Sequence, residues 1–205
     1  MKLYGHPSST CTRKVLATLN EKGQNADFIV VELSKGEHKA ADYLTRQPFG
    51  QIPVIDDNGF VLYESRAIAR YVDETLPGPK LTPTDAKGRA LMEQWISVET
   101  SNFTPHAMKI IYQRVFNAFR GQSSDEAVVA EASVTAGRAL DVLDRQLAKT
   151  HYLTGAQFTL ADIGFMPYFE YLVTGKAGDL IVARKNVSRW WEEIRARDSW
   201  KRIVG

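Results

Sequence analysis

In the first third of the chain, short hydrophobic segments with the pattern of strands alternate with segments that have the spacing of helices. Residues 2–4 and 28–31 are brief runs of apolar and β-branched side chains, which is typical of strands that are buried in a sheet. Thr10–Glu21 and Ser65–Thr75 instead place their apolar residues at helical spacing. This part of the chain therefore predicts strands and helices in alternation.

A hairpin is predicted between the third and fourth strands. The sequence Asp57-Asn58-Gly59 favours a tight turn because asparagine and glycine readily adopt positive φ angles. It separates the apolar segments 52–55 and 61–63, and residues 40–45 add one or two helical turns before them. The predicted order is β-α-β-α-β-β-α, which describes a small α/β domain.

Helical spacing alone accounts for the rest of the chain. The segment Pro77-Gly78-Pro79 cannot continue a helix, because proline lacks the amide donor and restricts the residue before it. We therefore expect an α/β domain at residues 1–76, a linker at 77–84 and an all-helical domain at 85–205. The apolar residues of the helical domain lie three and four positions apart, with a break expected near Pro105: Leu91, Trp95, Val98, Ile110, Ile111, Val115, Ala136, Leu140, Leu143, Leu147, Val187, Trp190, Trp191 and Ile194.

Composition excludes several classes of protein. The chain has 205 residues, of which 44% are hydrophobic and 24% charged, as in an ordinary soluble globular protein. No apolar run approaches the ~18–20 residues that cross a bilayer, and the N-terminus resembles no secretory signal. The net charge of +2 is spread without a basic stripe, which argues against nucleic-acid and membrane partners. The single cysteine, Cys11, excludes an internal disulfide and a multi-cysteine metal site, and it fits a reducing, cytoplasmic compartment.

The first candidate motif lies where the first strand leads into the first helix. Ser8-Ser9-Thr10-Cys11-Thr12-Arg13 stands at the expected helix N-terminus. Unpaired N–H groups and a partial positive charge favour an anion or a thiolate at such a place. The alternative is that these residues only cap the helix, because serine and threonine are common caps.

Two further motifs follow. In Gln51-Ile52-Pro53 a proline lies at the entry of the strand predicted at residues 52–55, which indicates either an edge strand or a cis peptide bond. A cis bond would leave the Ile52 backbone free to pair with an extended ligand. Glu64 and Ser65 begin the third helix, where a carboxylate can accept from an ammonium group while the helix N–H groups hold a carboxylate. They are again either a cap or a receptor for the head of an amino acid.

Together and in this order, the three motifs are similar to those of the cytosolic glutathione transferases. The chain most resembles the phi class of plants and related microbes, over essentially its whole length. Other specific matches are Gly36-Glu37-His38-Lys39, Pro48-Phe49-Gly50 and Phe158-Thr159-Leu160-Ala161-Asp162, the last of which matches the family's buried N-capping box. The resemblance implies a thioredoxin-like domain followed by an all-helical domain that contributes an electrophile pocket.

The resemblance also assigns roles to single residues. Ser9 matches the phi-class serine that donates a hydrogen bond to the sulfur of glutathione. His38 and Lys39 match residues that hold the glycyl carboxylate. Gln51, Ile52 and Pro53 match the contacts along the cysteinyl stretch, with Pro53 as the cis-proline. Glu64 and Ser65 match the receptor for the γ-glutamyl group. The implied reaction is attack by the glutathione thiolate on a small hydrophobic electrophile, as in detoxification. Glutathione is the co-substrate, and no metal or other cofactor is expected.

Other interpretations stay open at this point. Cys11 at a helix N-terminus would suit a glutaredoxin-like thiol–disulfide enzyme, although free cysteines are often inert and buried. A non-catalytic carrier of glutathione or hydrophobic ligands is a second alternative, because a fold does not determine an activity. His6 and His106 match no set of metal ligands. An aromatic stripe is expected to be mostly core, with one or two members reaching the electrophile: Phe103, Tyr112, Phe116 and Phe119.

The loop around Phe49 predicts a homodimer. Proline and glycine on either side favour an exposed bend, where a large aromatic side chain is poorly placed for its own core. In several transferase classes the matching aromatic inserts between helices of the partner's helical domain. The alternative is that Phe49 folds back onto its own domain.

Overall fold

The computed structural model describes all residues from Met1 to Gly205, and they form two compact units. Unit 1 comprises Met1–Thr82 and Asp198–Gly205, and unit 2 comprises Pro83–Arg197. No helix in either unit is both long and apolar enough to span a membrane.

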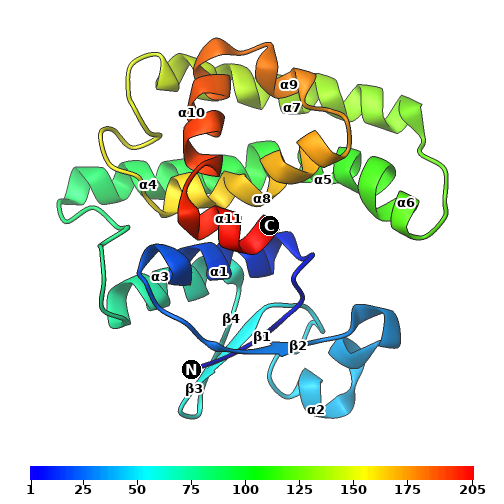
Figure 1. Cartoon of the computed structure of the whole chain (residues 1–205), viewed down its shortest axis with the longest axis vertical. Helices are drawn as coiled ribbons and strands as arrows, with labels where there is room; N and C mark the ends of the chain where they lie inside the picture. Colours follow the sequence, from blue (N-terminus) through cyan, green and yellow to red (C-terminus); the bar gives the residue numbers. More distant parts are fainter. The chain divides into compact units, whose positions relative to one another are not determined.

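Unit 1 has the predicted order of elements (Figure 1). Its main elements are β1 (Lys2–Gly5), α1 (Thr10–Glu21), β2 (Asp27–Val30), α2 (Ala41–Leu44), β3 (Val54–Asp57), β4 (Phe60–Tyr63) and α3 (Ser65–Thr75). Two short 3₁₀ turns, Leu33–Lys35 and Glu37–Lys39, lie between β2 and α2. The β-α-β-α-β-β-α prediction is therefore confirmed. β3 begins at Val54 rather than at residue 52, directly after Pro53, which has no N–H to donate to a ladder.

The four strands form one mixed sheet in the order β2-β1-β3-β4. β1 is parallel to β2 and antiparallel to β3, and β3 and β4 form the predicted hairpin. Successive side chains of a strand point to opposite faces, so each strand contributes to two cores. Leu3 and Ile55 pack with residues of α1 and α3 on one face. Val54 packs with Tyr43 of α2 in a second core on the other.

The last helix belongs to unit 1, which differs from the expectation of a helical domain that runs to residue 205. In α11 (Asp198–Val204) the Trp200 side chain is completely buried. The Asn20 side-chain amide of α1 donates to the carbonyl of Ser199 over 2.8 Å, and the Ser199 hydroxyl donates to Glu21. Figure 1 shows α11 beside α1. An amphipathic pattern shows that a helix has an apolar face but not which surface that face covers.

Unit 2 is entirely helical. Its helices are α4 (Ala86–Val98), α5 (Thr104–Ile111), α6 (Asn117–Phe119), α7 (Glu126–Leu147), α8 (Leu160–Thr174), α9 (Asp179–Val182) and α10 (Lys185–Arg195). α8 is buried on nearly all sides, and its aromatic residues form the centre of the core with Phe103 and Trp190. The thioredoxin-like domain followed by a helical domain is therefore confirmed.

The break in the apolar stripe near Pro105 does not end the helix. Two π-helical turns, Glu99–Phe103 and Tyr112–Phe116, join α4, α5 and α6 into one continuous helical run. Pro105 is the second residue of α5 and directly follows the first π turn. A π turn changes the hydrogen-bond register within a helix, so the chain accommodates the proline without interruption.

Candidate active site

The register of the sheet brings the sequence motifs to one edge. Tyr4 in β1 pairs with Val54 in β3, and Val54 pairs with Tyr63 in β4. Pro53 directly precedes Val54, and Glu64 directly follows Tyr63. β1 ends one residue after Tyr4, so the loop that leads to α1 leaves from the same edge. Residues far apart in sequence thus meet around the N-termini of α1 and α3.

Ser9 is the N-cap of α1. Its side-chain oxygen accepts from the backbone N–H of Thr12 over 3.2 Å, and its own N–H donates to the carbonyl of His6 over 2.9 Å. The first turn of α1 contains no acidic residue that would oppose the positive end of the helix dipole. Because the cap uses only a lone pair of the hydroxyl, the Ser9 proton remains available to a bound anion. The capping interpretation and the catalytic one are therefore compatible.

The loop that contains Gln51 and Pro53 is held by two buried side chains. The Ile52–Pro53 peptide bond is cis, as the sequence indicated. The Gln51 carbonyl accepts from the Tyr43 hydroxyl over 2.8 Å, and the Gln51 N–H donates to the Gln47 side chain over 3.2 Å. Burial raises the pKa of Tyr43 to about 12, so this hydroxyl stays a donor at any working pH. The Ile52 backbone lies outside the ladder, which starts at Val54.

Gln47 and Tyr43 were not found from the sequence. Gln47 is only 2% exposed, and its side-chain oxygen also accepts from the N–H of Phe49 over 2.7 Å. A single glutamine or tyrosine has no distinctive pattern, and its role here depends on a loop that returns to it. The proline and glycine of Pro48-Phe49-Gly50 were the only signal that a fixed loop needs such support.

His38 and Lys39 lie on the 3₁₀ turn Glu37–Lys39, against the same loop. The Lys39 ammonium donates to the carbonyl of Phe49 over 2.9 Å, and the half-buried His38 has an unpartnered Nδ1 atom. Gly50 has φ +59°, and a Cβ there would lie 2.7 Å from the His38 carbonyl, so only glycine fits. This contact places both residues beside the Gln51–Pro53 segment.

Glu64 precedes α3 with an unusual backbone. Its φ of 71° and ψ of 106° lie in a region that residues other than glycine seldom occupy. Its side chain is exposed, whereas Ser65 is buried in the first turn of the helix. A strained backbone that presents an exposed carboxylate at a helix N-terminus is typical of a binding site.

Cys11 is a free cysteine of intermediate burial in the first turn of α1. Nothing in its geometry separates the thiol–disulfide alternative from an inert cysteine, so that alternative stays a prediction. His6 forms hydrogen bonds with Ser8, and His106 lies in unit 2 at a separate cavity.

The aromatic stripe of unit 2 divides into core and surface. Phe103 is completely buried against Phe165 and Phe169, so it belongs to the core. Tyr112 is 47% exposed and packs edge-to-face on Phe116, with ring centroids 5.2 Å apart. Phe116 is half-buried and Phe119 is 73% exposed, so the expectation of a mostly buried stripe is wrong.

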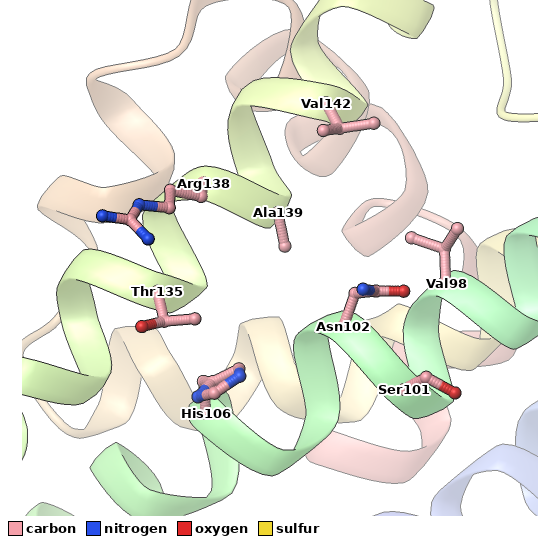
Figure 2. Close-up of a pocket in the computed structure, with 8 residues that line it drawn as sticks. All are labelled: Val98, Ser101, Asn102, His106, Thr135, Arg138, Ala139 and Val142. Atoms are coloured by element: carbon pink, nitrogen blue, oxygen red, sulfur yellow. The ribbon is translucent and has the colours of Figure 1, made fainter.

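Unit 2 also contains a cavity of about 430 Å³ between α7 and the helical run that starts with α4. In Figure 2, Asn102 and His106 approach it from one side, and Ala139 points into it from the opposite helix. Its lining is mostly apolar or small: Val98, Ser101, Asn102, His106, Thr135, Arg138, Ala139 and Val142.

Comparison with known proteins identifies the family. The profile described as Glutathione S-transferase, N-terminal domain, matches residues 1–74, and that described as Glutathione S-transferase, C-terminal domain, matches residues 103–198. Glutathione S-transferase F11 of Arabidopsis thaliana is 39% identical over 208 residues, which cover 100% of this chain and 97% of that protein.

Solved structures agree. Glutathione transferase F2 from Populus trichocarpa is 40% identical, with a TM-score of 0.95 over 99% of this chain and 96% of the other. Glutathione S-transferase I from maize, solved with an atrazine glutathione conjugate, is 27% identical, with a TM-score of 0.92 over 99% and 95%. The chain thus belongs to the glutathione S-transferase family and most resembles its plant phi-class (F) members.

Proposed function

We propose that the chain binds glutathione on unit 1 and holds its thiol as a thiolate for attack on hydrophobic electrophiles. The observation that carries this proposal is the hydrogen-bond geometry of Ser9. Its oxygen caps α1 through the Thr12 N–H, and its proton is free to donate to sulfur. The helix N-terminus adds a positive potential at the same point.

The charged ends of glutathione have receptors of matching chemistry. The exposed Glu64 carboxylate suits the γ-glutamyl ammonium group, while Ser65 and the N-terminus of α3 suit its carboxylate. The Ile52 backbone next to the cis-proline Pro53 is open to the cysteinyl segment, in the manner of an added strand. Gln51 borders this segment.

The glycyl carboxylate is assigned to His38 and Lys39. The Lys39 ammonium uses one of its three donors on the carbonyl of Phe49 and keeps the others for a ligand. His38 lies on the same 3₁₀ turn as Lys39.

The protein's part in the chemistry is to stabilise an anion. A free thiol has a pKa near ~8.5, so only a few per cent is ionised at neutral pH. Lowering that pKa by about two units corresponds to ~2.7 kcal/mol of preferential thiolate binding. Ser9 supplies a hydrogen bond and does not act as a base, because its own hydroxyl is ionised only at very high pH. The thiolate then displaces a leaving group from the electrophile or adds to it.

The electrophile is assigned to unit 2, as part of a functional division into residues 1–76, a linker at 77–84 and a helical domain from residue 85 to Arg197, because α11 belongs to unit 1. The exposed Tyr112 and the half-buried Phe116 offer an aromatic surface suited to a small hydrophobic molecule. Phe103 has no part in it, because it is buried in the core. A detoxifying role in the cytoplasm follows from this chemistry and from the reducing compartment that free thiols need.

We also propose that the protein is a homodimer. Phe49 is 64% exposed, although its loop is held at both its N–H and its carbonyl. The cavity in Figure 2 offers a receptor for this side chain on a second copy of the chain.

Replacement of Ser9 and Cys11 tests the proposed function. With glutathione and a panel of electrophiles, Ser9→Ala should lower kcat by roughly 10²-fold and raise the pKa of the bound thiol, because one donor to the anion is lost. Glutathione affinity should change little, since the ends of the peptide are held elsewhere.

Cys11→Ser is the matched control and should keep full activity. The reverse result, an active Ser9→Ala and an inactive Cys11→Ser, would transfer the role to Cys11 and to thiol–disulfide chemistry. Glutathione binding by the wild type without turnover of any electrophile would favour a carrier.

A further inference from the structure

The backbone of His6 is hydrogen-bonded within the turn that contains Ser9. Its carbonyl accepts the Ser9 N–H over 2.9 Å, and its own N–H donates to the Thr12 hydroxyl over 3.3 Å. Thr12 in turn supplies the N–H that the Ser9 side chain caps. The backbone of His6 is thus bonded to both ends of the capping interaction.

The imidazole of His6 contacts the neighbouring serine at two atoms. The Ser8 backbone N–H donates to Nδ1 over 3.2 Å, and the Ser8 hydroxyl oxygen lies 2.6 Å from the same atom. A backbone N–H can only donate, so Nδ1 must present its lone pair. The ring proton is therefore on Nε2, and the Ser8 hydroxyl donates to Nδ1.

The two adjacent serines consequently differ in what they offer a ligand. Ser8 gives its only hydroxyl proton to His6 and is left as an acceptor. Ser9 accepts from Thr12 and keeps its proton. A thiolate needs a donor, so only Ser9 presents the right group.

We propose that His6 is a positioning residue for thiol activation, because its Nδ1 atom holds the Ser8–Ser9 turn and engages the Ser8 proton, leaving Ser9 as the donor to sulfur. This inference rests on the proposed function of Ser9. In this proposal His6 acts through Ser8 and Ser9, to which it is hydrogen-bonded, and not on the sulfur itself.

A pair of substitutions isolates the Nδ1 acceptor. In His6→Asn the side-chain oxygen stands the same number of bonds from the backbone as Nδ1, and can accept from Ser8 as in an Asx turn. In His6→Gln the acceptor stands one bond further out, at the position of Nε2. Both variants keep the backbone contacts of residue 6.

His6→Gln should lower kcat about tenfold with the KM for glutathione within about threefold, whereas His6→Asn should stay within about threefold of the wild type in both. The pKa of bound glutathione, followed by thiolate absorbance, should rise by about one unit in His6→Gln and stay unchanged in His6→Asn. Nitrogen NMR of the wild type should show the proton on Nε2.

Three outcomes would overturn the inference: equal losses in the Asn and Gln variants, wild-type kcat and thiol pKa in His6→Gln, or a proton on Nδ1. Ser9→Ala, measured beside them, keeps the two proposals apart. If Ser9→Ala loses activity while His6→Gln does not, only the role of His6 is wrong. If Ser9→Ala is fully active, the proposed function of Ser9 fails as well.

Discussion

Glu64 combines backbone strain with a proposed binding role in a single residue. Positive φ at a residue other than glycine costs about 1–3 kcal/mol, and the Glu64 backbone lies at φ 71°. The Ser65–Thr75 helix starts directly after it, so this conformation sets where the exposed carboxylate stands relative to the helix N-terminus. Stability and ligand affinity are therefore expected to oppose each other at this position.

Two substitutions at Glu64 separate these effects. Glu64→Gly should raise the free energy of unfolding by about 1 kcal/mol, because glycine accepts the backbone conformation without strain. It should also weaken glutathione binding by roughly 10- to 100-fold, since a charge-assisted hydrogen bond worth ~1.5–3 kcal/mol is lost. Glu64→Gln should weaken binding without the gain in stability. Calorimetry and denaturant unfolding measure the two quantities.

Ser65→Ala serves as the companion variant and should weaken binding through the lost hydroxyl. Wild-type affinity in both Glu64→Gln and Ser65→Ala would show that the γ-glutamyl receptor lies elsewhere. A drop in stability in Glu64→Gly would show that the backbone at residue 64 is not strained.

At the scale of elements, the N-terminus of α8 is built around a buried carboxylate. Asp162 is inaccessible to solvent and accepts from the N–H groups of Leu153 and Thr159 over 3.1 and 2.9 Å, and from the Trp190 indole over 3.0 Å. Burial raises the pKa of Asp162 to about 6, although these donors oppose the rise. The capping box therefore joins α8 to α10 and to the segment before α8, and it makes the fold sensitive to pH.

The pH dependence has a definite sign. The unfolded carboxyl ionises near 3.8 and the folded one near 6, so the folded state holds the extra proton between these values. This contribution to stability is complete below the lower pKa and is lost as pH rises through about 6, by roughly 3 kcal/mol. Asp162→Asn should be less stable than the wild type throughout. The difference between their free energies of unfolding should shrink as the pH rises from 4 to 7.

Denaturant unfolding of both proteins across that range tests this. Glu131→Gln, an exposed carboxylate on α7, is the control and should follow the wild type at every pH. Parallel curves for the wild type and Asp162→Asn would contradict the raised pKa.

A buried ion pair joins the C-terminus of α1, α3 and the segment after α3. The Lys22 ammonium lies 3.0 Å from Asp73, both side chains being inaccessible to solvent, and it also donates to the carbonyl of Pro79 over 3.1 Å. Burial alone would raise the pKa of Asp73, but the N–H of Leu81, the Thr82 hydroxyl and Lys22 hold it below its usual value. The ionised pair thus fixes the proline-rich segment at the end of the α/β domain.

Breaking this pair should be costly. Asp73→Ala leaves the Lys22 charge buried without its partner and should lower the free energy of unfolding by about 3–5 kcal/mol. Lys22→Met with Asp73→Leu removes both charges and should recover most of the loss, apart from about 1–3 kcal/mol for the unpaired Leu81 N–H. Equal stability of the single and double variants in denaturant unfolding would refute a charge-based explanation.

Elements with local signals were predictable from the sequence. The Asp57-Asn58-Gly59 hairpin, the Ser9 cap and the capping box at Thr159 each depend on neighbouring residues, and each is present. The π-helical turns were not predictable: the break in the apolar spacing near Pro105 indicated an irregularity, but not a change of register within one continuous helical run. Neighbouring residues determine where an element begins, whereas the way in which a helix accommodates a proline depends on the packing around it.

For the molecule as a whole, the candidate site was predictable as a set of residues but not as an arrangement. Ser9, Pro53 and Glu64 were each found at the end of an element, and the sheet register then brings those ends to one edge. Gln47 and α11 were missed, because their contacts join segments that are distant in the chain. Family resemblance supplied the roles of the residues, which patterns of polarity do not contain.

The homodimer is the prediction that involves the whole molecule. Phe49 is exposed on a loop whose backbone is fixed by Gln47 and Lys39, and its ring contacts that of Tyr63, with centroids 6.3 Å apart. A rigidly held, exposed aromatic loses little entropy when it is buried, which is what an interface anchor requires. In a two-fold interface this anchor occurs twice, so its truncation removes two contacts from each dimer.

Three variants test this assembly by sedimentation across a dilution series. Phe49→Ala should weaken the dimer by about 2–4 kcal/mol per anchor, which over two anchors raises Kd at least roughly 10³-fold. Ala139→Phe should do the same by filling the proposed receptor cavity without touching the loop. Phe119→Ala removes another exposed aromatic and should leave the dimer intact. A wild-type monomer at micromolar concentration would refute the dimer. An undisturbed Ala139→Phe dimer would show that this cavity is not the receptor for Phe49.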